Sequence, residues 1–191
     1  MSWKSSSSVA SSSKKWKKCP KVTPFKLHCT KRLNKYLTQR GKQMNQHTHA
    51  VADTLKKVMA DTYALYFKTH SFHWNVEGER FVSLHTLFEE HYNNMWMALD
   101  EIAERIRSLE IYAPCNAAEL YKITEIKDET EAKNAGEMIT TLITDHTTVM
   151  STLKKAVSVA EEAEDHASTD LILGRLSWHE KTVWMLRSLN K

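Results

Sequence analysis

Five side chains that could ligate a metal ion lie in one stretch of the chain: His73, His85, Glu89, Asp100 and Glu104. Neutral imidazole and carboxylate groups are ligands of iron(II) and of other divalent first-row ions. Such a set leaves coordination positions open for an oxidant, and its negative charge stabilises the +3 state. A closed structural zinc site would instead favour thiolates, which this stretch lacks. These residue types therefore indicate a site for iron or a related ion.

The spacing of these residues does not suit a single ion in one chain. If residues 82–109 form one helix, His85 and Glu89 lie one turn apart, and so do Asp100 and Glu104. The step from Glu89 to Asp100 returns to within ~20° of the same face, but ~16 Å further along the helix. Ligands lie only ~2 Å from their ion. Either the pairs are unrelated charges on a solvated face, or an antiparallel second copy completes the site across a two-fold interface.

Hydrophobic periodicity predicts an all-α, four-helix bundle over residues 50–191. Four glycines and three prolines are few for 191 residues, and no segment alternates between apolar and polar residues as a strand would. The first long helix runs from residue 50 until Gly78 interrupts it. The others are expected near residues 82–109, 130–160 and 169–189, with a short crossing helix near residues 116–123. No glutamate stands three residues before any of the ten histidines, so the signature of a di-iron centre within one bundle is missing.

The basic residues are concentrated before the bundle. Residues 1–52 hold 12 lysines and arginines and no acidic residue. The rest of the chain has a net charge of −8, so the whole chain has a net charge of +4. We expect residues 1–49, rich in serine and lysine, to form a disordered arm. Such an arm can bind DNA through phosphate contacts. The alternatives are a transit peptide or a solubilising tail. The candidate DNA-binding residues are Lys14, Lys15, Lys17, Lys18, Lys31, Arg32 and Lys35.

Composition also indicates the cellular compartment in which we expect the protein. No apolar run approaches the ~20 residues that span a bilayer, so we expect no membrane segment. Cys19, Cys29 and Cys115 form no Cys-x-x-Cys pair, which fits a reducing compartment without a disulfide framework. We expect a cytoplasmic, nucleoid-associated protein, or an organellar one if the arm is a transit peptide.

Two segments resemble the signatures of a known family. The run from His73 to Glu89, H-W-N-V-E-G-E-R-F-V-S-L-H-T-L-F-E, is similar to the first signature of the Dps family, the DNA-binding proteins from starved cells. The run L-D-E-I-A-E-R, from Leu99 to Arg105, is similar to the second. The end of the last helix, from His179 to Arg187, also resembles that family. The likeness covers about residues 50–190.

The resemblance implies a ferritin-like bundle that assembles as a hollow dodecamer with a ferroxidase site at each two-fold interface. One chain would supply His73, His85 and Glu89, and its partner would supply Asp100 and Glu104. The family oxidises iron(II), preferentially with hydrogen peroxide, and stores ferric iron, which protects DNA. A nucleoid-binding architectural protein with a vestigial iron site is the main alternative function. A conventional ferritin is a weaker one.

Three further positions follow from the resemblance. Asp165 and Asp170 match the acidic pores through which the family draws in iron(II), although both could equally serve as charges at the N-terminus of the last helix. Glu110 stands where the family usually has a glycine that caps the second helix in a left-handed conformation. We therefore expect the end of that helix to differ, but not the metal site.

Overall fold

The structure is a computed structural model that describes residues 24–128 and 133–189. The chain divides into two compact units, residues 1–40 and residues 41–191. Over the described ranges the chain is helical, without strands. The helices are α1 (Pro24–Asn75), α2 (Phe81–Ser108), α3 (Ala117–Ile123), α4 (Ala135–Glu162) and α5 (His166–Leu189). The predicted all-α class and the short crossing helix are confirmed.

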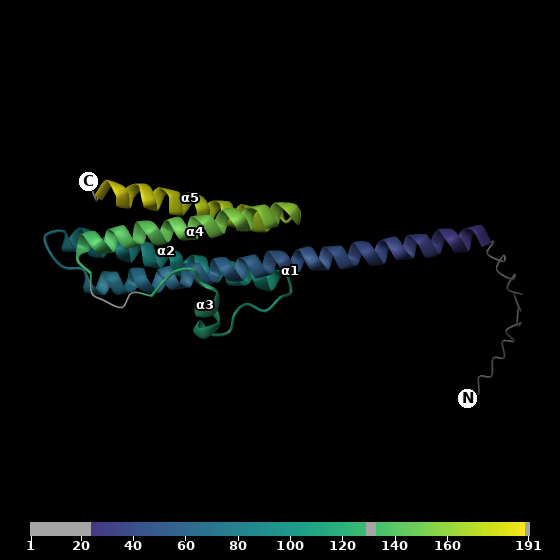
Figure 1. The fold of residues 1–191 in the computed structure, drawn as a ribbon, viewed down its shortest axis with the longest axis horizontal. Helices are drawn as coiled ribbons and strands as arrows, with labels where there is room; N and C mark the ends of the chain where they lie inside the picture. Colours follow the sequence, from purple (N-terminus) through teal and green to yellow (C-terminus); the bar gives the residue numbers. More distant parts are fainter. Residues whose placement is uncertain (1–23, 129–132, 190–191) are drawn as a thin grey trace, which may run out of the picture. The chain divides into compact units, whose positions relative to one another are not determined.

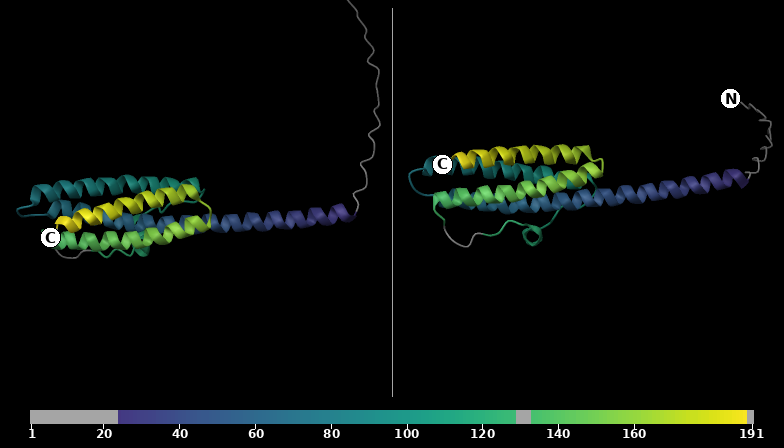
Figure 2. Two further views of the ribbon diagram at one scale, coloured as in Figure 1. Left: turned by 90° about the horizontal axis from the view of Figure 1, so that it is seen from above. Right: turned by 45° about the horizontal axis from the view of Figure 1, so that its top comes forward.

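Within the second unit, the C-terminal part of α1 packs beside α2, α4 and α5 as a four-helix bundle (Figure 1). The long connection that carries α3 returns along the outside of the bundle, so α2 and α4 run in the same direction (Figure 2). One long crossover of this kind is the connectivity of ferritin-like bundles. The core is formed by large side chains from all four long helices, among them Leu65, Phe88, Leu142 and Ile172, each at most 1% exposed.

Asp61 attaches the crossing connection to the bundle. Its carboxylate is fully buried, and Oδ1 accepts hydrogen bonds from the Thr124 hydroxyl at 2.9 Å and the Glu125 backbone N–H at 2.8 Å. Oδ1 also accepts from Lys57 Nζ at 2.9 Å, and Oδ2 accepts from the Thr152 hydroxyl at 2.7 Å. A buried carboxylate is stable only when paired and hydrogen-bonded. Asp61 therefore links α1, α4 and the segment that follows α3.

The structure differs from the predicted arm boundary. Helix α1 begins at Pro24, so residues 24–49, which the sequence predicts as disordered, are helical. Between residues 32 and 46 every side chain whose burial the structure describes is exposed, Tyr36, Leu37 and Met44 among them, which is why the sequence carries no hydrophobic period there. Lysine, arginine, glutamine and leucine nevertheless favour helix intrinsically. Lys14, Lys15, Lys17 and Lys18 lie outside the described residues.

Capping residues explain the shifted ends of the later helices. Helix α4 begins at Ala135 rather than near residue 130, because Asn134 and Glu137 form a reciprocal capping box. After α2, Glu110 has a φ of +63°, the left-handed conformation in which glycine is usual. The expectation that this helix end would differ is therefore wrong: it keeps the left-handed geometry of a glycine cap, at a cost of about 1 kcal/mol for the side chain that adopts it.

Candidate metal centre

His73 and His85 form a reciprocal pair at the end of the bundle where α1 reverses into α2. The two imidazole rings are stacked, with centroids 3.7 Å apart and planes 21° from parallel. His73 Nδ1 lies 2.8 Å from the His85 carbonyl oxygen, and His85 Nδ1 lies 2.8 Å from the His73 carbonyl oxygen. Because a carbonyl oxygen only accepts, both Nδ1 atoms must carry the hydrogen.

This pairing selects the tautomer that suits a metal ligand. In a neutral imidazole with hydrogen on Nδ1, the lone pair is on Nε2, one of the two nitrogens through which histidine binds metals. Hydrogen bonds from the second ring nitrogen to a backbone carbonyl are the usual means of orienting a ligating histidine. His73 is buried, at 8% exposed, and His85 is partly buried, so both rings are held in place. The pair thus presents two oriented Nε2 lone pairs.

The three candidate carboxylates are exposed side chains of α2. Glu89 follows His85 by one turn, whereas Asp100 and Glu104 belong to the part of α2 near its C-terminus. The helical rise separates Glu89 from Asp100 by about 16 Å. In the described part of the chain, no three side chains of His, Cys, Asp or Glu come close enough together to hold a metal ion. One chain therefore presents two incomplete sets of candidate ligands, one where α1 turns into α2 and one near the C-terminus of α2.

Aromatic rings surround the histidine pair on one side. The Tyr92 ring lies 5.3 Å from the His73 ring and stacks on His70 at 3.9 Å. His70, three residues before His73, packs between Tyr92 and Trp74, and its ring centroid lies 4.3 Å from that of Trp74. Burial, together with the nearby His73, lowers the pKa of His70. Trp74 itself is 57% exposed rather than a core residue.

The two predicted pore residues have different surroundings. Asp165 accepts two hydrogen bonds from Arg105 Nη2, at 2.7 and 2.8 Å, and others from the backbone N–H and hydroxyl of Ser168. Burial by itself would raise the pKa of Asp165, but the hydrogen bonds from Arg105 and Ser168 outweigh it and lower the pKa. Asp165 therefore acts as the N-cap of α5. Asp170 is exposed, and a pore role remains a prediction for both.

Inside the bundle, three histidines that were not among the candidate site residues meet from α2, α4 and α5: His91, His146 and His179. His146 Nδ1 and His179 Nδ1 are 2.7 Å apart, so one ring donates to the other. Burial lowers the pKa of His91 to about 4 and that of His146 to about 3, and it lowers the pKa of His179 well below its usual value. All three are neutral at pH 7. The sequence signal that could have revealed their burial is helical position: His146 lies four residues after the buried Leu142, on the same face of α4.

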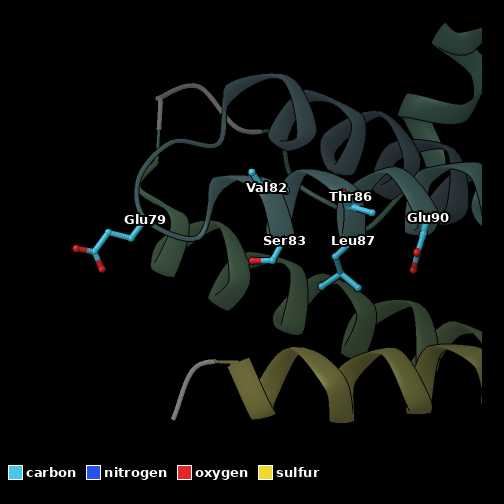
Figure 3. A pocket seen from close by; sticks show the side chains of 6 residues that line it. All are labelled: Glu79, Val82, Ser83, Thr86, Leu87 and Glu90. Carbon is cyan, nitrogen blue, oxygen red and sulfur yellow. The ribbon is translucent and has the colours of Figure 1, made fainter.

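A surface hollow of about 530 Å³ lies along the first turns of α2. Figure 3 shows its lining, in which Ser83, Leu87 and Glu90 project from one side of the helix. None of the five candidate ligands lines it. The hollow is therefore separate from the candidate ligands.

Comparison with known proteins identifies the family to which the chain belongs. Residues 52–191 match the ferritin family, described as a ferritin-like domain. DNA protection during starvation protein 2 of Bacillus anthracis is 35% identical over 138 residues, which cover 72% of this chain and 94% of that protein. The chain belongs to the Dps family. This family membership confirms the expected ferritin-like fold.

Solved Dps structures share the fold as well. The crystal structure of a Dps protein from Bacillus brevis superposes with a TM-score of 0.74 at 34% identity, covering 76% of this chain and 98% of that one. The Dps protein from Vibrio cholerae O1, described as a member of a broad superfamily of ferritin-like diiron-carboxylate proteins, is 26% identical with a TM-score of 0.74. The match covers 77% of this chain and 92% of the Vibrio cholerae chain. Among residues 24–128 and 133–189, no helix is long and apolar enough to cross a membrane.

Proposed function

We propose that this Dps-family chain oxidises iron(II), with hydrogen peroxide as oxidant, at a site shared between two copies, and stores the ferric product. The observation that carries the proposal is the reciprocal His73–His85 pair, which holds two Nε2 lone pairs in a ligating orientation. Glu89 stands one turn from His85 on an exposed face of α2. Two imidazoles and a carboxylate fit iron(II) but leave its coordination incomplete.

A second copy of α2 supplies what is missing. If two α2 helices pack antiparallel about a two-fold axis, the His85 end of one lies beside the Asp100 end of the other. Asp100 and Glu104 of one copy then join His73, His85 and Glu89 of the other, and each pair of chains forms two equivalent sites. Iron(II) is the substrate here. Two iron(II) ions supply the two electrons that reduce one hydrogen peroxide to water, so no hydroxyl radical is released.

A double substitution tests the iron chemistry. We expect His73→Ala combined with Asp100→Ala to abolish peroxide-dependent iron(II) oxidation, because it removes one ligand from each contributing set. Loss of a group that only orients a metal ligand typically costs about 10- to 100-fold, so loss of two ligands should cost more. The measurement is ferric absorbance after peroxide is added to anaerobic iron(II)-loaded protein. The matched control is His166→Ala with Glu180→Ala, two exposed residues of α5. Equal rates in wild type and the double variant would contradict the proposal.

The same chemistry would protect DNA, as the names of the starvation proteins indicate for those relatives. By consuming iron(II) and peroxide together, a shell of these chains, which we propose to be a dodecamer, removes the reactants that generate hydroxyl radicals. It would act in the cytoplasm close to the nucleoid. In α1, Arg32 and Lys35 are exposed and available to phosphates.

Removal of the basic segment tests DNA binding. We expect a chain that starts at Ala50 to lose most of its affinity for DNA, because it lacks the excess of lysine and arginine that neutralises phosphates. A gel shift at low salt measures this, and added salt should weaken binding by the full-length chain. Equal binding by both forms would rule out the N-terminal segment as the DNA-binding element. DNA binding without any iron oxidation would favour the architectural alternative.

A further inference from the structure

An unbroken series of aromatic rings leads away from the histidine pair. The ring of His73 lies 5.3 Å from that of Tyr92, and Tyr92 lies 6.3 Å from Tyr66. From Tyr66, one branch continues to Trp96 at 5.6 Å and another to Tyr63 at 6.2 Å. Trp96 is 57% exposed in the single chain, but it shares the α2 face of Glu89 and Asp100 that the proposed two-fold pairing covers, so the Tyr63 branch is the one that leads to solvent. Electrons tunnel readily between rings at contact distance.

Tyr66 differs from the other rings because it has a proton acceptor. Its phenolic oxygen lies 3.4 Å from His70 Nδ1, one helical turn further along α1. A phenol loses its proton when it loses an electron, so an oxidisable tyrosine needs a base within hydrogen-bonding reach. Such contacts are often long in the absence of substrate. Burial, with Tyr63 and Tyr92 nearby, raises the pKa of Tyr66, so the phenol is protonated at neutral pH.

We infer that Tyr66 is a one-electron donor to the oxidant when the site holds only one iron(II). The inference rests on the proposed function. One iron(II) and one Tyr66 phenol together give two electrons, and the peroxide O–O bond breaks to form two waters. Of the two protons required, one comes from the phenol by way of His70 and one comes from solvent. The products are one iron(III), a neutral tyrosyl radical and two waters, and no hydroxyl radical forms.

The neighbouring rings give this electron a defined path. Tyr92 stands between His73 and Tyr66, and it contacts both rings. On the far side, Tyr63 continues to Tyr121, whose ring is 6.0 Å away and whose side chain reaches the surface. The oxidising equivalent therefore moves away from the iron and towards side chains that a reductant in solution can reach. A radical that remained beside the site would damage its ligands.

The test uses full-length assembled protein loaded with one iron(II) per site and then mixed with hydrogen peroxide. Rapid freezing followed by electron paramagnetic resonance detects the radical, and a spin trap measures hydroxyl radical. In wild type we expect a tyrosyl signal and little trapped hydroxyl radical. In Tyr66→Phe, which keeps the ring and removes only the hydroxyl, we expect that signal to be lost and hydroxyl radical to increase. Tyr112→Phe, an exposed tyrosine 79% accessible, is the matched control and should behave as wild type.

Two readouts separate this inference from the proposed function. With two iron(II) per site, Tyr66→Phe should oxidise iron as fast as wild type, because iron then supplies both electrons. If iron is oxidised but wild type forms no tyrosyl radical, or the radical is unchanged in Tyr66→Phe, the inference is wrong while the ferroxidase proposal stands. If no variant oxidises iron(II) at either loading, the ferroxidase proposal fails.

Discussion

Particles assembled from a mixture of His73→Ala and Asp100→Ala chains are expected to recover iron(II) oxidation that neither variant has alone. A two-fold interface between identical chains contains two equivalent sites, each made of the histidine set of one chain and the carboxylate set of the other. In a pair of unlike variants, one site collects both substitutions and is inactive. The other combines intact histidines from the Asp100→Ala chain with intact carboxylates from the His73→Ala chain.

The size of the recovery is fixed by random pairing. Half of the pairs are mixed and each mixed pair has one intact site of two, so about a quarter of all sites should be active. The two variants are co-expressed with different tags, particles that carry both tags are purified, and their rate is compared with wild type and with each parent. An equimolar mixture of preassembled parents is the control, and it should stay inactive. Inactive co-assembled particles would contradict a shared site.

The separation along α2 also shows how far the sequence could lead. The period of apolar residues locates the four long helices, because each must bury a stripe against the others. The ligand spacing, with a fixed rise per residue, already shows that Glu89 and Asp100 cannot share an ion within one chain. The structure agrees, since its described residues bring no three such side chains together.

What the sequence could not give depends on contacts without a periodic signal. The α1 segment before residue 50 is a helix with exposed side chains, so no buried stripe reveals it. The pairing of His73 with His85 joins two helices through backbone carbonyls, which no residue type encodes. Asp165 is a candidate pore residue, and only the structure shows that its carboxylate pairs with Arg105 and caps α5 through the Ser168 backbone N–H. Tertiary geometry decides such roles.

The buried histidines predict a second large effect, a loss of stability on mild acidification. His146 and His179 lie in the core between α4 and α5, 0% and 1% exposed, with His91 facing them from α2. Arg175 is the charged group nearby, and it and His91 add to the effect of burial in lowering the pKa of both. Nε2 of each ring finds no hydrogen-bond partner among the described residues, so nothing in the core compensates a positive charge there.

The sign follows from the lowered pKa values. In the unfolded chain both imidazoles take up protons as the pH falls through about 6.5, whereas folded His146 does so only near a pKa of about 3. Between these values the unfolded state binds more protons, so the free energy of unfolding decreases with decreasing pH. The two neutral histidines make their full contribution to the free energy of unfolding above pH 6.5, and this contribution is lost progressively as the pH falls below that value. For His146 alone this amounts to roughly 2 to 3 kcal/mol between pH 7 and pH 4.5, and His179 acts in the same direction.

Denaturant unfolding at a series of pH values, followed by tryptophan fluorescence, measures the loss, because Trp178 lies 4.8 Å from the His179 ring. Carboxylates titrate in the same range, so the decisive quantity is the difference between wild type and His146→Leu combined with His179→Leu. Replacing both partners of a buried polar pair with apolar groups is close to neutral at pH 7. The double variant should therefore lose several kcal/mol less than wild type on acidification, while His49→Leu, an exposed site, should follow wild type. Parallel pH profiles for wild type and the double variant would mean that the buried pair does not control acid stability, and the loss would then have to come from the carboxylates.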